Sequence, residues 1–465
     1  MPELTGEAFG FTLNTLDHFV LVRDASWGLL MTELVTEIDT PRVVHVSITS
    51  ACNWDCIFCT AHNRPGTTYP TETIYRVLDR LAKAGVVAVV LYGGEPTLHP
   101  DFINIGKYAK DLGLDVGIIT NGARITRENI DKITDVFSSI AVSIHSFRQI
   151  HDKITSVSGS FDQAMRALDL LALEGAPLMV NTTVTTLNLF NFDKFIKFLY
   201  YRYPQILGFV VNRATFTGRN KEYTLNRAEI VEVVRRVKVL KDNGIPLNLG
   251  VPIPPCILPT ELKGFATFCS AGVLFADITG DGLVRPCSNV GQNDILGNIL
   301  DEDLRKLWNS EKIVKFRSYT WAPEQCRSCT LFTNCFGGCK RAPNGTWRID
   351  PIAMEPYEEF YVANPYNRIM HVNNVEAIMS NMTPAVVFEE DDLEKVKKIL
   401  AVLKEPLSLA EVVEKVGMSQ TEAKVIIEKL LELMLVVKVY RKNITVYNTS
   451  ELFSMTHVID ANTWD

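Results

Sequence analysis

Short apolar runs separated by amphipathic segments dominate the first half of the chain. Six runs are rich in branched residues and short enough for buried strands: 43–48, 86–92, 116–120, 140–144, 179–184 and 209–211. Four intervening segments have helical spacing: 72–84, 102–112, 161–171 and 192–201. Apolar runs of this kind are typical of parallel strands covered on both faces, and their alternation with helices predicts an α/β fold. Six strand-then-helix units fit either a partial barrel or a doubly wound sheet.

The end of the chain has a different pattern. Segments 391–403, 408–416 and 419–435 are helical by spacing, and the β-rich runs 436–440 and 444–447 follow. Three helices and a hairpin predict a winged-helix-like domain, which we place at 381–465. Such domains bind DNA, peptides or other proteins, so the fold alone does not decide the function. The lysines of this region alternate with acids, which is typical of a solvated face.

Composition narrows the class of protein. The 465 residues are 47% hydrophobic and 22% charged, which is typical of a globular protein of several domains. A net charge of -7 argues against general binding to nucleic acid or to an anionic membrane surface. No apolar run reaches the roughly 20 residues that span a bilayer, and the N-terminus lacks a signal-peptide pattern. We therefore expect a cytoplasmic protein whose ten cysteines bind metal rather than form disulfides.

Three of these cysteines, Cys52, Cys56 and Cys59, follow the first apolar run within eight residues. Iron–sulfur cubanes are held by cysteine thiolates, and a set of three is one short of the four that close a 4Fe-4S cluster. One iron would then be open to another ligand. Zinc is the alternative, but zinc sites usually have four nitrogen or sulfur ligands. The nearest candidate for a fourth is His62.

This loop resembles that of the radical S-adenosylmethionine (SAM) superfamily. The resemblance implies a six-stranded partial (β/α) barrel, similar to a TIM barrel, with its cofactors at the carboxyl ends of the strands. It also implies that the open iron of the 4Fe-4S cluster binds SAM. Reductive cleavage of SAM would then produce a 5'-deoxyadenosyl radical that takes a hydrogen atom from the substrate.

Further motifs occupy the expected strand ends. Gly93, Gly94, Glu95 and Pro96 follow the second run and match the family motif that holds the SAM amino group. Thr120 and Asn121 end the third run, Ser143 and His145 end the fourth, and Asn181 lies on the fifth. The resemblance implies that Ser143, His145 and Asn181 help to hold the SAM ribose and carboxylate. Ordinary turns and polar core residues remain the alternative reading of these positions.

A second group of cysteines follows the barrel pattern. Cys269 and Cys287 flank Gly282, at separations of twelve and four residues. Cys326, Cys329, Cys335 and Cys339 follow, with two, five and three residues between them. This order resembles the SPASM extension of radical SAM enzymes, which holds one or two auxiliary 4Fe-4S clusters. A zinc ribbon would account for four of these cysteines but not for six in this order.

The pattern departs from the SPASM family at two points. No cysteine follows Cys339, so the last ligand is missing, and an additional cysteine, Cys256, lies upstream. The resemblance implies that Cys256, Cys269, Cys287 and Cys339 hold the first auxiliary cluster. Cys326, Cys329 and Cys335 would hold the second, which then lacks one protein thiolate. Its fourth ligand could come from the acidic stretch 350–359, from a small molecule or from the substrate.

These patterns predict five regions: an N-terminal extension at 1–40, the barrel at 41–245, the SPASM domain at 246–350, a linker at 351–380 and the winged-helix-like domain. The resemblance implies an enzyme that modifies a ribosomally made precursor peptide and receives electrons from a reductase, flavodoxin or ferredoxin. A radical SAM enzyme acting on a small molecule, as a dehydrogenase or in cofactor biosynthesis, is the alternative. A third possibility is an iron–sulfur redox sensor whose winged helix binds DNA, although a sensor does not need the SAM-facing turns. The catalytic acid and base residues are not identifiable from the sequence, and Tyr92 is only a candidate.

Overall fold

The six predicted strands all belong to one sheet of ten strands, in the order β10-β9-β8-β1-β2-β3-β4-β5-β6-β7. The six predicted strands are β1 (Val43–Thr49), β2 (Ala88–Gly93), β3 (Asp115–Thr120), β4 (Ser139–Ser143), β5 (Leu178–Val184) and β6 (Gly208–Arg213). The other four are β7 (Leu247–Leu249), β8 (Phe275–Thr279), β9 (Leu283–Arg285) and β10 (Gly297–Asn298). Strands β1 to β7 pair in parallel. The predicted α/β fold with a partial barrel is thereby confirmed.

These coordinates are a computed structural model. The structure describes residues 39–439 except 62–64, 216–218, 220, 289–291, 341–348, 355–359, 364–367, 373–374, 381–382, 388–389 and 434. His62 and nearly all of the expected N-terminal extension 1–40 therefore lie outside the described residues. The chain divides into two compact units, 1–355 and 356–465.

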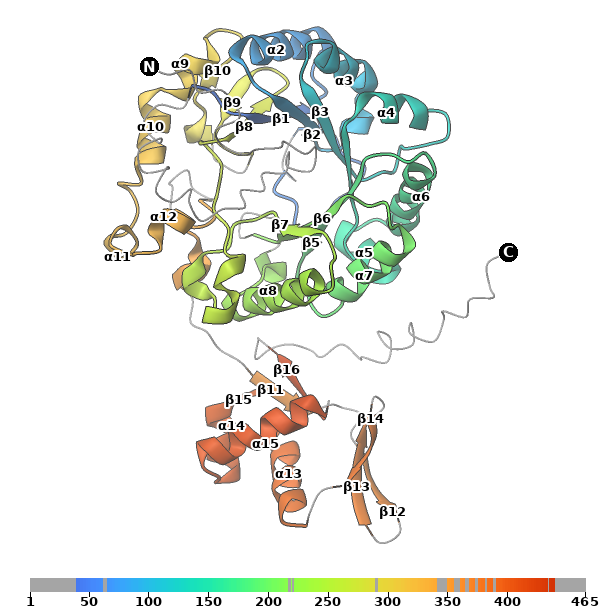
Figure 1. Cartoon of the computed structure of the whole chain (residues 1–465), viewed down its shortest axis with the longest axis vertical. Helices are drawn as coiled ribbons and strands as arrows, with labels where there is room; N and C mark the ends of the chain where they lie inside the picture. Colours follow the sequence, from blue (N-terminus) through green and yellow to red (C-terminus); the bar gives the residue numbers. More distant parts are fainter. Residues whose placement is uncertain are drawn as a thin grey trace. The chain divides into compact units, whose positions relative to one another are not determined.

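Helices cover the outer face of the curved sheet, as Figure 1 shows. They are α2 (Thr71–Ala84), α3 (Phe102–Asp111), α4 (Ile130–Val136), α5 (Arg148–Thr155), α6 (Ser160–Leu173), α7 (Phe192–Arg202) and α8 (Arg227–Asp242). Side chains alternate between the two faces of a strand. On β1, the apolar Val44, Val46 and Ile48 are fully buried, and the polar Ser47 and Thr49 alternate with them. This alternation leaves polar side chains of the strands on the inner face of the sheet.

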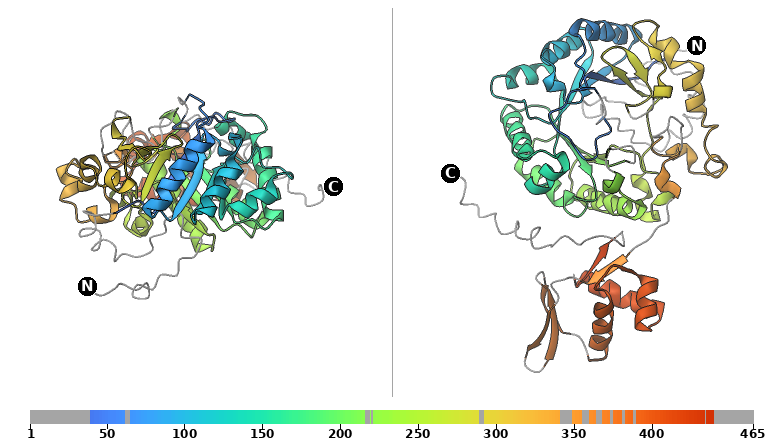
Figure 2. Two further views of the ribbon diagram at one scale, coloured as in Figure 1. Left: turned by 90° about the horizontal axis from the view of Figure 1, so that it is seen from above. Right: turned by 180° about the vertical axis from the view of Figure 1, so that it is seen from behind.

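The cysteine-rich region continues the barrel sheet. Strand β8 pairs in parallel with β1, from Val43 opposite Phe275 to Ser47 opposite Thr279. Strands β9 and β10 then add antiparallel pairs beyond β8. Short helices follow: α9 (Leu304–Trp308), α10 (Glu311–Ser318), α11 (Glu324–Arg327) and α12 (Phe332–Cys335). The first strand of the barrel is thus held between β2 and a strand of the cysteine-rich region (Figure 2).

The described residues of the second unit form two small sheets and three helices. Its elements are β11 (Phe360–Ala363), β12 (Arg368–Val372), β13 (Val375–Ser380), β14 (Thr383–Val387), α13 (Glu390–Val402), β15 (Leu407–Ser408), α14 (Leu409–Val416), α15 (Gln420–Glu432) and β16 (Val436–Val439). Strands β12, β13 and β14 form one sheet, and β11 pairs with both β15 and β16 in the other. Leu393, Ile399, Val412 and Leu430 belong to the core between the helices.

Two sequence expectations concern this second unit. Residues 356–380, expected to be a linker, belong to the unit, and strands β11, β12 and β13 lie there. The expected hairpin partner of β16, residues 444–447, lies outside the described residues, and β16 instead pairs antiparallel with β11. The winged-helix assignment itself stays a prediction.

A buried ion pair joins the barrel to the end of the cysteine-rich region. Arg213, the last residue of β6, pairs with Asp350, and their side chains are 4% and 1% exposed. Arg213 also donates a hydrogen bond to the carbonyl of Pro252 at 3.1 Å. Asp350 in turn accepts a hydrogen bond from the backbone of Cys339 at 3.2 Å.

In the described part of the chain, no helix is both long enough and apolar enough to cross a membrane.

This ion pair predicts a large effect of Arg213→Met on stability. The substitution leaves the Asp350 carboxylate buried without its partner, and such a loss typically costs about 3–5 kcal/mol. Arg148→Met is the matched control, because its ion pair with Asp162 is 54% and 50% exposed and exposed pairs contribute at most about 1 kcal/mol. Anaerobic urea unfolding of both variants measures the difference, and equal losses would contradict it.

Candidate active site

The loop that carries Cys52, Cys56 and Cys59 leaves the carboxyl end of β1 and is anchored at several points. The backbone N–H groups of Asp55 and Ile57 donate to the carbonyls of Thr155 and Ile154, at 3.1 and 2.9 Å. These two carbonyls belong to the end of α5. The loop is therefore tied to the barrel by its own backbone.

Side chains strengthen this anchoring. Trp54 is buried, its ring packs edge-on against His151 at 5.4 Å, and its Nε1 donates to Gln163 at 3.3 Å. On the other side of the loop, Arg219 forms an ion pair with Asp55, and its backbone N–H donates to the carbonyl of Cys59 at 3.1 Å. The segment after β6 thus contacts the loop that follows β1.

The three thiols of this loop lie close enough to affect one another. Burial raises the pKa of Cys52 to about 11, and Cys59 contributes to the increase. Burial also raises the pKa of Cys56 well above its ordinary value, with further contributions from Cys59 and Cys52. Backbone N–H groups of Trp54 and Ala61 point at the sulfurs of Cys52 and Cys59, at 3.4 and 3.3 Å. Three clustered thiols with N–H groups directed at them are a donor set that suits iron.

The three thiols of this loop suit a cubane, whose thiolate ligands bind different irons. Within the described residues, no group of three His, Cys, Asp or Glu side chains is arranged to hold one metal ion. None of the ten cysteines, all of which lie in the described part of the chain, is in a disulfide.

The turn after β2 packs directly onto this loop. The N–H of Gly94 donates to the carbonyl of Thr49 at 2.8 Å, and the N–H of Glu95 donates to the carbonyl of Ala51 at 2.7 Å. A Cβ atom at Gly93 would lie 2.0 Å from the Thr49 oxygen, and one at Gly94 would lie 2.1 Å from the Ala51 oxygen. Both positions therefore require glycine because the backbone of the turn touches the backbone that leads into the cysteine loop.

Glu95 connects this turn to the end of β3. The carboxylate is buried and its Oε1 accepts hydrogen bonds from the Thr97 N–H, the Thr97 hydroxyl and the Thr120 hydroxyl, at 3.1, 2.6 and 2.6 Å. Its Oε2 accepts the Asn121 N–H at 2.7 Å. Burial raises the pKa of Glu95, and these hydrogen bonds oppose the increase. Each carboxylate oxygen has about two lone-pair positions, and Oε2 accepts one of these hydrogen bonds, so it has a position for a further donor such as an amine. Pro96 begins the short helix η3 (Pro96–Leu98) beside it.

The other predicted SAM contacts lie on β4 and β5 or directly after β3 and β4. Asn121 donates to Asn53 of the cysteine loop at 2.8 Å. Ser143 on β4 stands opposite Asn181 on β5, and Asn181 accepts a hydrogen bond from Asn212 on β6 at 2.6 Å. His145 is buried, burial lowers its pKa well below the ordinary value, and its ring packs edge-on against Phe58 at 5.0 Å.

Sequence reasoning missed Asn53, Phe58 and Asn212. All three residues lie near a strand end or inside the cysteine loop, and this position is the signal that could have identified them.

A polar network that the sequence did not reveal lies beside the same turn. Tyr92, next to Gly93, hydrogen-bonds to Asp277 on β8, which is fully buried. Arg285 on β9 binds the other oxygen of Asp277 with two N–H groups, its Nε at 2.8 Å. Burial lowers the pKa of His45 to about 4, although Asp277 opposes this, so the adjacent imidazole is neutral. Only the pairing of β8 with β1 brings these residues together.

Several of the remaining cysteines lie within reach of one another's charge. Cys256 lies in the short helix η5 (Pro255–Ile257), and Cys329 contributes to the increase of its pKa that burial causes. Cys269 and Cys339 both favour the charged form of Lys340. The assignment of these cysteines to two clusters stays a prediction.

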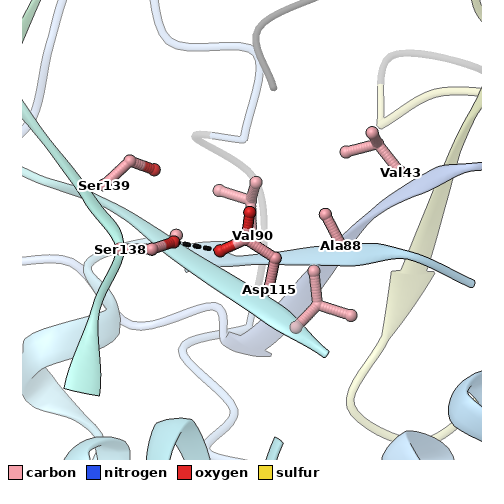
Figure 3. Close-up of a pocket in the computed structure, with 8 residues that line it drawn as sticks. Val43, Ala88, Val90, Asp115, Ser138 and Ser139 are labelled. Carbon is pink, nitrogen blue, oxygen red and sulfur yellow. Dashed lines mark hydrogen bonds between the residues drawn. The ribbon is translucent and has the colours of Figure 1, made fainter. Parts of the chain in front are cut away.

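A small pocket lies at the other end of the sheet (Figure 3). Val43, Ala88, Asp115 and Ser139, the first residues of β1 to β4, help to line it. Ser138 hydrogen-bonds to Asp115 there. The pocket contains no cysteine and is separate from the loop described above.

Comparisons with known proteins agree with this geometry. Residues 46–199 match the radical SAM superfamily, and residues 269–330 match the SPASM family, described as an iron–sulfur cluster-binding domain. The AdoMet-dependent heme synthase of Methanosarcina barkeri is 24% identical over 70% of this chain and 98% of its own length. The PqqA peptide cyclase of Bradyrhizobium diazoefficiens is 26% identical over 64% of this chain and 81% of its own length. The mycofactocin maturase MftC of Mycobacterium tuberculosis is 28% identical over 66% of this chain and 80% of its own length.

Solved structures have the same fold. SuiB of Streptococcus suis bound to S-adenosylmethionine matches with a TM-score of 0.57 and 19% identity, over 68% of this chain and 76% of that one. SuiB bound to precursor peptide SuiA also matches with a TM-score of 0.57, at 18% identity over 71% of this chain and 80% of that one.

Proposed function

Because this chain belongs to the radical SAM superfamily and carries a SPASM cluster-binding domain, we propose that it modifies a ribosomally made peptide with a radical derived from SAM. One observation supports the SAM chemistry most strongly. The Gly93–Gly94 turn hydrogen-bonds to the backbone leading into the loop of Cys52, Cys56 and Cys59. A redox sensor with no SAM site would not need this close junction.

We assign the SAM-binding 4Fe-4S cluster to Cys52, Cys56 and Cys59. When bound, the cluster would supply the one electron that cleaves SAM to methionine and a 5'-deoxyadenosyl radical, and this radical would take a hydrogen atom from the substrate. The chain holds and orients the reactants. Glu95 would accept the SAM amino group at Oε2, and the backbone of Gly93, Gly94 and Pro96 would shape the same side of the site.

The end of the barrel would complete the SAM site. Thr120 and Asn121 fix the Glu95 carboxylate, Ser143 is the last residue of β4, and Asn181 stands opposite it in the middle of β5. In our proposal the polar atoms of Ser143 and Asn181 hold the ribose and carboxylate of SAM. His145 is buried and packs on Phe58, so we give it the role of supporting the cysteine loop.

The peptide substrate is supported by the relatives and by the second unit. A PqqA peptide cyclase and a mycofactocin maturase resemble this chain over about two thirds of its length, and SuiB is seen with a precursor peptide. A separate compact unit at 356–465 could hold one part of such a peptide while the barrel acts on another. A small-molecule substrate is the second candidate, because a heme synthase resembles this chain over a similar length.

Cell location and electron supply complete the proposal. Cysteines that bind metal instead of forming disulfides are typical of the reducing cytoplasm, and none of the ten described cysteines is in a disulfide. We therefore place the reaction in the cytoplasm, with a reductase, flavodoxin or ferredoxin as the electron donor. The negative net charge of the chain gives no support for nucleic acid as a partner.

Replacing Cys52, Cys56 and Cys59 together with Ala should abolish reductive cleavage of SAM, because no thiolate remains to hold that cluster. The measurement is 5'-deoxyadenosine formed under dithionite, without substrate, by anaerobically reconstituted protein. Auxiliary iron, expected at about 8 atoms per chain from two clusters of four, should stay bound and serves as the control for folding. Undiminished cleavage in this variant would remove the assignment.

Deleting the second unit should separate SAM cleavage from peptide turnover. A chain ending at residue 355 keeps the barrel and should still form 5'-deoxyadenosine without substrate. It should turn over a full-length precursor poorly, because tethering provides effective concentrations of about 1 mM that are then lost. Residues 356–465 added in trans should restore turnover only in part. Equal turnover by both chains, below the Kd of the intact complex, would favour the small-molecule substrate instead.

A further inference from the structure

Lys340 is a buried lysine that directly follows Cys339. It is 3% exposed, although lysine side chains usually keep their ammonium in water. Its Nζ donates a hydrogen bond to the Tyr319 hydroxyl at 2.6 Å. The same Nζ lies 4.6 Å from the centre of the Tyr319 ring and 4.9 Å from that of the Phe316 ring. Aromatic faces attract a cation, so this arrangement suits a protonated ammonium that contacts a phenol and two rings.

The other basic side chains that are buried in the described part of the chain have stronger partners. Arg213 forms its ion pair with Asp350. Arg317, which is 2% exposed, donates to two backbone carbonyls at 2.6 and 2.8 Å. A buried charge normally needs a counter-charge or several hydrogen bonds, because burial removes its hydration. Among the described residues, Lys340 has one hydrogen bond, to a neutral group, so its burial calls for an anion nearby.

The expected cluster ligand Cys339 supplies the nearest candidate for that anion. The Cα atoms of consecutive residues are about 3.8 Å apart, and Cys339 is buried as well. A 4Fe-4S cluster with its thiolates carries a net negative charge, and charge is one of the properties that set its reduction potential. A buried cation at this position would therefore act on the redox equilibrium of the cluster.

Packing holds the ammonium in this place. Tyr319 has a φ of 54° and Phe336 one of 47°, in the left-handed region that residues other than glycine rarely adopt. The two rings stack with their centres 5.2 Å apart, and both residues belong to one buried cluster. Such conformations persist where the surroundings fix them, and they gather at functional sites. The Tyr319 hydroxyl is therefore fixed where it accepts the hydrogen bond from Lys340.

We propose that Lys340 is a fixed positive charge that raises the reduction potential of the auxiliary cluster held by Cys339. The proposal rests on the proposed function only in requiring that Cys339 ligates an auxiliary 4Fe-4S cluster. One-electron reduction by the external donor adds a negative charge to the cluster and moves no proton, so a nearby cation favours the reduced state. Unit charges about 10 Å apart, at an effective dielectric constant of about 20, change such an equilibrium roughly tenfold.

Replacing Lys340 with Met removes the charge but keeps an unbranched side chain against the two rings. At a given applied potential, the ratio of reduced to oxidised auxiliary cluster should fall roughly tenfold, which lowers the midpoint potential by about 59 mV for one electron. The measurement is an anaerobic redox titration of the reconstituted full-length protein, followed by EPR. Iron content equal to that of wild type shows that the cluster is still bound.

Three further variants separate the charge from the hydrogen bond and from the packing. Lys340→Gln is neutral but can still bond to Tyr319, so it should lower the potential as the Met variant does. Lys340→Arg keeps a cation and should stay near the wild-type potential. Lys315→Met removes an exposed charge from α10, the helix that also carries Phe316, and should change little because exposed charges are screened. Loosened packing alone would admit water, which favours the more highly charged reduced state and raises the potential.

An unchanged or raised potential in Lys340→Met with full iron content would overturn the proposal. Lys340→Gln at the wild-type potential would do so too, as would a decrease in Lys340→Arg or Lys315→Met equal to that of the neutral variants. Where circular dichroism melting shows that one neutral variant is unfolded, the other and Lys340→Arg still decide. Wild-type protein that cleaves SAM and holds auxiliary iron confines a failure to Lys340, whereas wild-type protein without auxiliary iron would count against the proposed function.

Discussion

The close contact between two backbone segments at the carboxyl ends of β1 and β2 organises this protein. Gly94 and Glu95 donate to the carbonyls of Thr49 and Ala51, and no side chain larger than hydrogen fits at Gly93 or Gly94. This contact sets the start of the cysteine loop relative to the turn that carries Glu95. Glu95 then fixes the end of β3 through Thr120 and Asn121. Three strand ends are therefore held together by hydrogen bonds within the chain itself.

The cysteine-rich region is part of the same framework. Because β8 pairs with β1, Asp277 reaches Tyr92 across the sheet, and the buried pair of Arg213 and Asp350 joins β6 to the segment after Cys339. These two interactions connect the cysteine-rich region to β2 and to β6 of the barrel. Auxiliary clusters would thus be held at fixed positions relative to the SAM site, as transfer of electrons or substrate groups between them requires.

Local patterns were sufficient to predict much of this arrangement. The six strands were predicted from periodicity and the cysteine loop from its spacing, because each depends on neighbouring residues. The partial barrel and the role of the turn at Gly93 were implied by the family resemblance. The pairing of β8 with β1 depends on contacts between distant segments, which spacing does not encode. Residues 351–380 were expected to be a linker, whereas β11 acquires its structure by pairing with β15 and β16. The network of Asp277, Arg285 and Tyr92 had no local signal for the same reason.

The central claim is that Cys52, Cys56 and Cys59 hold a cluster whose open iron binds SAM. Low-temperature EPR of the dithionite-reduced, reconstituted full-length protein, recorded with and without SAM, tests it most directly. The account predicts that the signal of one cluster changes when SAM is added, because the SAM amino and carboxylate groups would become iron ligands at a position that the protein leaves open. Identical spectra at saturating SAM would contradict it.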